Sequence, residues 1–348
     1  MNFAREIINW YLLNKRDLPW RETSDPYIIW LSEIIMQQTR VEQGLPYFRK
    51  FAERYPTVAD FASATEDEIL KHWQGLGYYS RGRNMHHTAQ IVMEEHAGYF
   101  PNNYDKLLKL KGIGEYTAAA ISSFSANEAK AVVDGNVFRL LSRYFGIQTP
   151  INSGPGKKEF TALANQVMDV LKPGIYNQAA MEFGSLQCKP VKPDCSICPL
   201  QPSCNAYQTN RIDLLPVKIK SSKARHRYFN FIVAAKDEHV LMQKRGAKDI
   251  WENLYQLPLF ESDGAIDANK LLYKSEFTEC FGASATIKSI SAPIKHLLSH
   301  QHLHVQFIEI ENFTDRNISL NGLFYANSTD VGTLAQPKVI FEFLENFF

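Results

Sequence analysis

Four of the five cysteines lie close together in the pattern C-x6-C-x2-C-x5-C. Four thiolates in so short a segment can hold one metal centre, either a zinc ion or an iron–sulfur cluster. Zinc sites usually contain two close Cys pairs, whereas this segment has only one, so the spacing favours a [4Fe–4S] cluster. The fifth cysteine, Cys280, stands alone and is expected to be a packed thiol. The predicted ligands are Cys188, Cys195, Cys198 and Cys204.

Two carboxylates have surroundings that suit glycosidic bond cleavage. Glu33 lies in a helical pattern beside Trp30 and Met36, where loss of hydration would keep a carboxylic acid protonated and able to donate a proton. Asp134 directly precedes the amphipathic segment 137–145, where helix N–H groups would hold a carboxylate ionised. The alternatives are a solvated glutamate and a purely capping aspartate. A protonated and an ionised carboxylate that flank one sugar are the usual pair for this chemistry.

The segment 110–118 joins two helical patterns through a turn that contains Gly112 and Gly114. Two glycines let the backbone N–H groups of such a turn point outward, and the start of the next helix adds positive potential. Lys111 places a positive charge at the same turn. This arrangement suits a phosphate group, and the alternative is a simple connection between two helices.

The chain divides into a helical part and a β-rich part. Residues 1–205 show helical periodicity with Gly and Pro turns, and residues 227–348 show strand patterns. The basic segment 206–226 between them is predicted to be a linker. The basic residues in and beside it are Arg211, Lys218, Lys220, Lys223, Arg225 and Arg227. The predicted helices include 26–38, 66–73, 84–95, 104–110, 116–125, 137–145, 157–171, 177–184, 267–280 and 336–347, and the predicted strands are 228–235, 239–244, 287–292, 303–310 and 323–327.

The composition excludes several classes of protein. The 348 residues are 45% hydrophobic and 22% charged, as in a globular protein that needs no disulfides to fold. Lys+Arg 38 against Asp+Glu 37 gives a net charge of +1, which is no overall nucleic-acid signature but leaves room for a local basic surface. The sequence shows no secretory signal and no apolar stretch of about 18 residues, so we expect a cytoplasmic protein without a membrane partner.

These motifs together resemble the MutY-type adenine DNA glycosylases of the helix–hairpin–helix, iron–sulfur superfamily. The resemblance covers nearly the whole chain and is stronger over residues 1–205 than beyond. It implies an α-helical helix–hairpin–helix glycosylase domain with a [4Fe–4S] cluster loop at 188–204, followed by a smaller α+β Nudix-like domain at 227–348. The matching segments are 18–21, 30–39, 75–81, 110–118, 133–137 and the four cysteines.

The resemblance implies a base-excision reaction on double-stranded DNA. An adenine paired with 8-oxoguanine or guanine would flip out of the duplex, and its N-glycosidic bond would be hydrolysed. Glu33 would protonate N7 of adenine and Asp134 would stabilise the sugar cation, with Tyr116 and Asn136 in support. The residues that match the adenine pocket are Trp20, Arg21, Met36, Gln178 and Glu182. Those that match DNA contacts are Gln38, Thr39, Leu76, Tyr78, Lys111, Gly112 and Gly114.

Two positions refine this expectation. Tyr116 stands where strand-cleaving relatives carry a lysine that forms a Schiff base, which predicts a monofunctional glycosylase. The turn Leu298-Ser299-His300 matches a lesion-reading Phe-Ser-His motif, with Leu298 in place of the aromatic residue. Residues 265–285 lack the R-E-x-x-E-E box of a Nudix hydrolase, so we expect no nucleotide hydrolysis by this domain. We also expect a monomer, associated with the nucleoid if the source is bacterial.

Two functions other than adenine removal are also compatible with these motifs. One is a related glycosylase for thymine or an oxidised pyrimidine, and the second domain together with Trp20 and Arg21 argues against it. The other is a non-catalytic iron–sulfur protein that binds DNA through the hairpin, and the presence of both Glu33 and Asp134 argues against it. The basic linker either follows the DNA backbone or is merely solvated.

Overall fold

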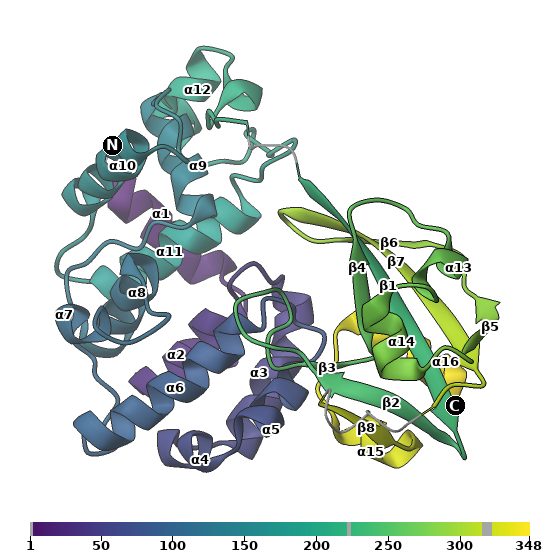
Figure 1. Cartoon of the computed structure of the whole chain (residues 1–348). Helices are drawn as coiled ribbons and strands as arrows, with labels where there is room; N and C mark the ends of the chain where they lie inside the picture. The colour runs from purple at the N-terminus through teal and green to yellow at the C-terminus, as the bar shows by residue number, and fades with distance from the viewer. Residues whose placement is uncertain (1–2, 221–223, 315–321) are drawn as a thin grey trace. The chain divides into compact units, whose positions relative to one another are not determined.

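The chain folds into two compact units, which the computed structural model shows in Figure 1. The helical unit comprises Met1–Ser63 and Asn84–Lys220, and the sheet unit comprises Ala64–Arg83 and Ser221–Phe348. Residues 64–83 therefore come from the helical part of the sequence but group with the sheet. The structure describes residues 3–220, 224–314 and 322–348.

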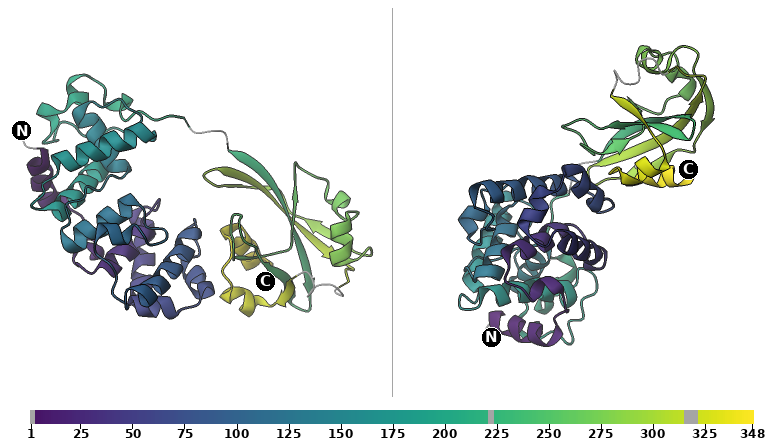
Figure 2. Two further views of the ribbon diagram at one scale, coloured as in Figure 1. Left: turned by 60° about the vertical axis from the view of Figure 1, so that its left-hand side comes forward. Right: turned by 90° about the horizontal axis from the view of Figure 1, so that it is seen from below.

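The helical unit is built of helices joined by short turns, as Figure 2 shows, and α1 packs against α11 (Figure 1). Its core includes the fully buried side chains of Ile7, Leu141, Phe160 and Phe183. No helix in the described part of the chain is long and apolar enough to cross a membrane. The helices are α1 (Phe3–Asn14), α2 (Pro26–Ile35), α3 (Val41–Arg54), α4 (Val58–Ser63), α6 (Ser80–Glu95, which begins in the sheet unit), α7 (Tyr104–Leu107), α8 (Glu115–Ala126), α9 (Gly135–Phe145), α10 (Gly154–Val167), α11 (Pro173–Leu186) and α12 (Asn205–Gln208).

Helix α2 carries Glu33 into the interior. The Asp25 carboxylate caps it by accepting a hydrogen bond from the Tyr27 N–H at 2.8 Å, and Pro26 occupies the first turn, where no N–H is needed. Eight of its ten residues are buried, because α2 packs against both α3 and α8. The helix ends three residues before the predicted boundary, and Gln38 then adopts a left-handed backbone with φ 54°.

Helix α9 is capped at its start by Asp134 and at its end by Gly146, whose left-handed φ of 73° suits glycine. The extended segment before it is held by Asn177 of α11, a fully buried side chain. The Asn177 Oδ1 accepts from the Val132 N–H at 3.0 Å, and its Nδ2 donates to the Lys130 carbonyl at 2.8 Å. These bonds replace sheet pairing for a buried backbone, so Asn177 fixes the approach of the chain to Asp134.

The sheet unit contains an eight-stranded sheet in which β3, β2, β1, β7 and β5 follow one another. The long strands β1 and β7 run parallel, and every other pairing is antiparallel. Helices α13 and α14 pack on one face around Phe277 and Phe281. The elements are α5 (Glu66–Trp73), β1 (Arg225–Lys236), β2 (His239–Lys244), β3 (Tyr255–Gln256), β4 (Leu259–Ser262), α13 (Ala268–Leu271), α14 (Ser275–Phe281), β5 (Thr286–Ile290), β6 (Ile294–Leu297), β7 (Gln301–Glu311), β8 (Leu323–Ala326), α15 (Ser328–Thr333) and α16 (Lys338–Phe347).

The sequence missed some of these elements. Strands β3, β4 and β6 have no strand pattern of their own, because each is held in place by pairing with a longer partner. The predicted helix 267–280 is two helices, α13 and α14, separated at Leu272–Lys274. The turn at 298–300 joins β6 to β7, so it is the tip of a hairpin.

Helix α5 attaches residues 64–83 to the sheet unit. Its first turn is acidic, as suits a helix N-terminus, and Thr65 and Glu68 form a capping box. The Asp67 carboxylate accepts from the Lys244 ammonium at 2.7 Å and from the Tyr255 hydroxyl at 2.8 Å. The loop after α5, which includes Leu76 and Tyr78, therefore starts from a helix tied to the sheet.

We expect Asn177→Ala to lower the free energy of unfolding of the helical unit by about 3 kcal/mol, because it leaves buried backbone groups without partners. Chemical denaturation followed by circular dichroism would measure this. Asn14→Ala is the matched control, since the Asn14 amide makes an exposed hydrogen bond to the Trp10 carbonyl. An equal, small effect of both substitutions would contradict the role of Asn177.

Candidate active site

Glu33 lies inside the helical unit with only 7% of its surface exposed. The Tyr116 hydroxyl, at the start of α8, donates a hydrogen bond to Glu33 Oε2 at 2.7 Å. Burial raises the pKa of Glu33 to about 7, although the Tyr116 hydrogen bond lowers it and the Asp134 charge raises it further. A carboxyl with this pKa is protonated in a large fraction of molecules at neutral pH, as a general acid must be.

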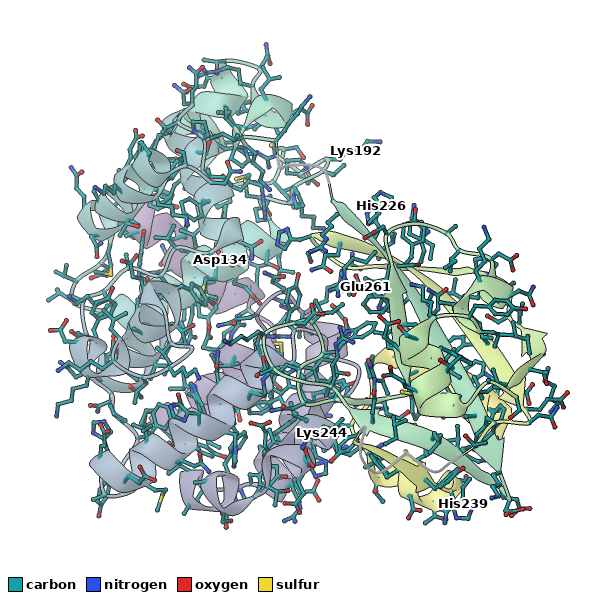
Figure 3. All side chains as sticks on the ribbon, viewed as in Figure 1. Asp134, Lys192, His226, His239, Lys244 and Glu261 are labelled. Atoms are coloured by element: carbon teal, nitrogen blue, oxygen red, sulfur yellow. The ribbon has the colours of Figure 1, made fainter. Side chains whose placement is uncertain are left out.

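Asp134 has the opposite surroundings, at the N-terminus of α9 (Figure 3). Its Oδ1 accepts from the Asn136 and Val137 N–H groups at 2.9 and 2.7 Å, and its Oδ2 accepts from the Asn136 side-chain amide at 2.7 Å. Burial raises the pKa of Asp134 above its usual value, although these three hydrogen bonds oppose that rise. Every bond described here is donated to the carboxylate, which favours its charged form.

Tyr116 connects the two carboxylates electrostatically. Burial raises the pKa of its phenol well above 10, and the charges of Glu33 and Asp134 raise it further. Because Asp134 also acts on Glu33, the three side chains share one site although 101 residues separate the carboxylates. The site thus contains an acid of pKa about 7, a hydrogen-bonded carboxylate and a neutral phenol.

A chain of hydrogen bonds leads from Asp134 to the cysteine segment. Asn136, which donates to Asp134, accepts a hydrogen bond from Arg139 Nη2 at 2.9 Å. Arg139 in turn donates to the carbonyls of Cys188 and Gly184 at 2.8 and 2.6 Å. Helix α9 therefore fixes both Asp134 and the first of the four cysteines. Arg139 was not predicted from the sequence, although its place one turn after Asn136 on the predicted helix was a signal.

The four predicted cysteine ligands line one small cavity together with apolar side chains such as Leu140 and Phe183. The fully buried Arg143 donates to Cys188 Sγ at 3.5 Å and to the Lys189 carbonyl at 2.7 Å. Such donors suit negatively charged sulfur. Within residues 3–220, 224–314 and 322–348, no three His, Cys, Asp or Glu side chains converge closely enough to hold a single metal ion.

Three of the predicted adenine-pocket residues, Arg21, Gln178 and Glu182, lie in a polar cluster near Glu33. Glu182 is 1% exposed and binds the guanidinium groups of Arg16 and Arg21, each at 2.7 Å. Burial alone would raise the pKa of Glu182, but these hydrogen bonds outweigh it and hold the pKa at about 2. Gln178 accepts from the Tyr11 hydroxyl at 2.5 Å. Sequence reasoning did not find Arg16 or Tyr11, which are brought here only by the packing of α1 on α11.

The remaining pocket candidates, Trp20 and Met36, lie beside α3. The Trp20 ring meets Phe48 edge-on with a centroid distance of 5.0 Å. The Met36 side chain lies against Gly44, where an added Cβ would come within 2.7 Å of its sulfur. Because Gly44 has no side chain, it leaves space for the Met36 side chain directly after α2.

The predicted phosphate-binding hairpin has the expected turn between α7 and α8. Gly112 has φ 81°, and an added Cβ there would lie 2.9 Å from the Asn84 Cβ, so glycine is required on both grounds. Gly114 caps α8, and the Lys111 carbonyl accepts from the buried Thr88 hydroxyl at 2.7 Å. The hairpin is therefore fixed from behind by α6.

The other predicted DNA contacts lie in turns. Gln38 and Thr39 follow α2, and Thr39 N–H donates to the Met36 carbonyl at 3.2 Å. Leu76 is buried at 6% exposure, whereas Tyr78 is 45% exposed with a left-handed φ of 48°. A bulky residue in that backbone conformation marks a strained turn.

Within the sheet unit, the tip of the β6–β7 hairpin faces a cavity of about 440 Å³. The Leu298 N–H donates to the Gln301 carbonyl at 2.8 Å, which closes the turn. The Ser299 hydroxyl hydrogen-bonds the Tyr78 hydroxyl. The cavity is lined by this turn, by His300 and by the loop 75–80, so two predicted contact segments meet there.

Comparisons with known proteins agree with this geometry. Residues 31–167 match the HhH-GPD superfamily base excision DNA repair protein family, and residues 230–346 match the NUDIX domain family. An adenine DNA glycosylase of Buchnera aphidicola subsp. Schizaphis graminum (strain Sg) is 33% identical over 353 residues, which cover 99% of this chain and 98% of that protein. The chain belongs to the adenine DNA glycosylase family.

Two further relatives each match about three fifths of this glycosylase. The adenine DNA glycosylase of Homo sapiens is 40% identical over 215 residues, covering 59% of this chain and 39% of that protein. A solved structure of a thermostable thymine-DNA glycosylase is 30% identical with a TM-score of 0.56, covering 60% of this chain and 95% of the other. The predicted fold class and the assignment as a DNA glycosylase are confirmed.

The pH dependence of this glycosylase should follow Glu33. Because the acid must be protonated, we expect the single-turnover rate to fall as the pH rises through about 7. Tyr116→Phe removes a hydrogen bond that lowers the pKa of Glu33, so the fall should move to higher pH. Tyr255→Phe is the control, because its hydroxyl binds Asp67 instead. A fall at the same pH in all three proteins would exclude Glu33 as the titrating acid.

Proposed function

We propose that this adenine DNA glycosylase removes adenine paired with 8-oxoguanine or guanine, and that it does so without cutting the strand. The observation that carries this proposal is the Tyr116 hydroxyl, which hydrogen-bonds an acid of pKa about 7 and lies in the field of Asp134. Burial raises the pKa of both Glu33 and Asp134, but Asp134 receives three hydrogen bonds that oppose this rise and Glu33 receives one, so the two carboxyls suit different roles in one reaction.

The reaction follows from these roles. The Glu33 proton moves to N7 of the flipped adenine, the C1′–N9 bond breaks, and its electron pair remains on the departing neutral base. The ionised Asp134 stabilises the oxocarbenium ion left at C1′. Water then adds to C1′, and its proton returns to the Glu33 carboxylate. Arg21 and Glu182 beside Glu33 would hold the adenine edge.

A Schiff base with the sugar requires an amine at C1′. Tyr116 is the residue beside the carboxylates, and its phenol stays protonated because burial raises its pKa well above 10. A tyrosine side chain has no amine nitrogen, so it cannot form a Schiff base in any protonation state. This supports base removal that leaves an intact abasic strand.

Recognition of the opposite base is assigned to the cavity at the β6–β7 hairpin. 8-Oxoguanine differs from guanine by an N–H donor at N7 and a carbonyl acceptor at C8. The hydroxyls of Ser299 and Tyr78 can each donate and accept, so together they can satisfy both new groups. Leu298 offers apolar contact to the same base in place of an aromatic ring.

A [4Fe–4S] cluster fits the cysteine segment. Cys188, Cys195, Cys198 and Cys204 would hold it, and their shared cavity, apolar walls and the Arg143 donor suit an anionic cluster. When bound, the cluster would supply a redox-active centre that also cross-links the loop 188–204. Arg139 and Arg143 hold the start of that loop on α9 through their hydrogen bonds to Cys188 and Lys189.

DNA binding is assigned to the hairpin at Gly112 and Gly114, whose N–H groups and helix start suit a phosphate. Lys218 and Lys220 of the basic linker would add further backbone contacts, which makes binding salt-sensitive. Lys223 of the same linker lies outside the described residues. We also propose that the enzyme acts as a monomer in the cytoplasm, at the nucleoid if the source is bacterial.

A single-turnover assay tests this function on duplexes with one 8-oxoguanine·adenine or guanine·adenine pair, labelled on the adenine strand. We expect strand breaks only after hot alkali, and faster with 8-oxoguanine. Glu33→Gln should still bind but release no adenine. Breaks without alkali would contradict the monofunctional mechanism, and release of thymine from a guanine·thymine pair instead would contradict the adenine assignment.

Metal analysis tests the cofactor. Protein purified without oxygen should be brown and contain about four iron and four sulfide ions per chain. Cys195→Ala should lose most of both, whereas Cys280→Ala should keep them, because Cys280 packs beside the core of the sheet unit. Zinc at one ion per chain without sulfide would overturn the cluster.

A further inference from the structure

Arg227 of β1 is a buried cation that reaches two walls of the cavity at the β6–β7 hairpin. It is 6% exposed and donates to Asp249 Oδ1 and Oδ2, each at 2.7 Å. It also donates two hydrogen bonds of 2.6 Å to Glu261 of β4, which Figure 3 labels on the sheet. A fifth hydrogen bond of 3.2 Å goes to the side chain of Gln301.

One of these walls is the loop between β2 and β3. Asp249, Ile250 and Trp251 of this loop line the cavity. Lys248 and Trp251 have left-handed φ values of 70° and 61°, which side chains of their size rarely adopt. Such a backbone persists only where its surroundings hold it.

The holding contacts come from two arginines. Arg227 and Arg245 both donate to the Asp249 carboxylate, and Arg245 also donates to the Ile250 carbonyl at 2.7 Å. Both guanidinium groups lie over the Phe229 ring, at 4.8 and 5.4 Å from its centroid. The ion pairs with Asp249 and the packing of both guanidinium groups on the Phe229 ring therefore hold the loop against β1.

The other wall is the tip of the β6–β7 hairpin. Gln301 accepts from Arg227 through its side chain, while its backbone carbonyl closes the Leu298–Gln301 turn. His296, four residues from His300, meets the Trp251 ring edge-on at a centroid distance of 5.9 Å. The loop between β2 and β3 therefore contacts β6 through Trp251 and His296, and Arg227 binds both this loop and Gln301.

We propose that Arg227 is a positioning residue for discrimination of the base opposite adenine, because it sets the separation of the loop 248–253 from the hairpin tip 298–300. The inference rests on the proposed reading of 8-oxoguanine by that tip. A buried ion pair is a weak source of stability, since desolvation offsets the attraction, but bidentate bonds fix geometry well. Fixed geometry is what a site needs to tell two purines apart.

The test compares single-turnover rates on 8-oxoguanine·adenine and guanine·adenine duplexes. Arg227→Lys keeps the charge but loses the planar fork, so we expect the 8-oxoguanine·adenine rate to fall about tenfold and the guanine·adenine rate to change less than twofold. Gln301→Met cuts only the link to the tip and should reduce the preference about threefold. Lys288→Met is the control, because it breaks an ion pair with Glu309 on the same sheet.

The outcomes separate the two proposals. Equal loss of both rates in Arg227→Lys, or a preference retained by both Arg227→Lys and Gln301→Met, overturns the role of Arg227. Gln301→Met guards against simple unfolding, since it leaves the carboxylate bonds of Arg227 in place. A wild-type protein with no preference between the duplexes overturns the proposed lesion reading itself.

Discussion

The helical unit depends on how α9 begins. Asp134 caps the helix with its carboxylate, so the bonds that start the helix are also the bonds that hold a charge at the site. Arg139 and Arg143 lie one and two turns further on and bind the segment that starts at Cys188. The extended chain before Asp134 is fixed by Asn177. Helix start, aspartate and cysteine loop therefore share one rigid element.

The two carboxylates show how burial alone does not decide ionisation. Glu33 and Asp134 both lose water, but only Asp134 receives backbone N–H groups, whereas Glu33 receives a single phenol hydrogen bond. Glu182 is buried more deeply than Glu33, yet two guanidinium groups keep its pKa at about 2. The number and charge of the hydrogen-bond donors therefore decide how far they oppose the effect of burial on the pKa of each acid.

The sheet unit uses charge in a different way. Arg227 and Arg245 bind Asp249, which lines the cavity at the β6–β7 hairpin, and so hold a strained loop in place. The turn 298–300 has a serine hydroxyl and a histidine imidazole, but Leu298 stands where the Phe-Ser-His motif has an aromatic ring. The loop at 249–251 forms a second wall of the same cavity. Loops and the hairpin tip supply most of the residues that line this cavity, and the strands hold them in place.

The sequence by itself determined the features that depend on near neighbours. The cysteine spacing, the Asp134 cap, the glycine hairpin and the helical pattern around Glu33 are local, and each was predicted in place. Pairings across long separations were decided only by the tertiary structure. Glu33 meets Tyr116 and Asp134, and Arg16 meets Glu182, because packed helices bring them together. Strands β4 and β6 and the Arg227 cluster were likewise invisible, since their partners lie dozens of residues away and no local period records them.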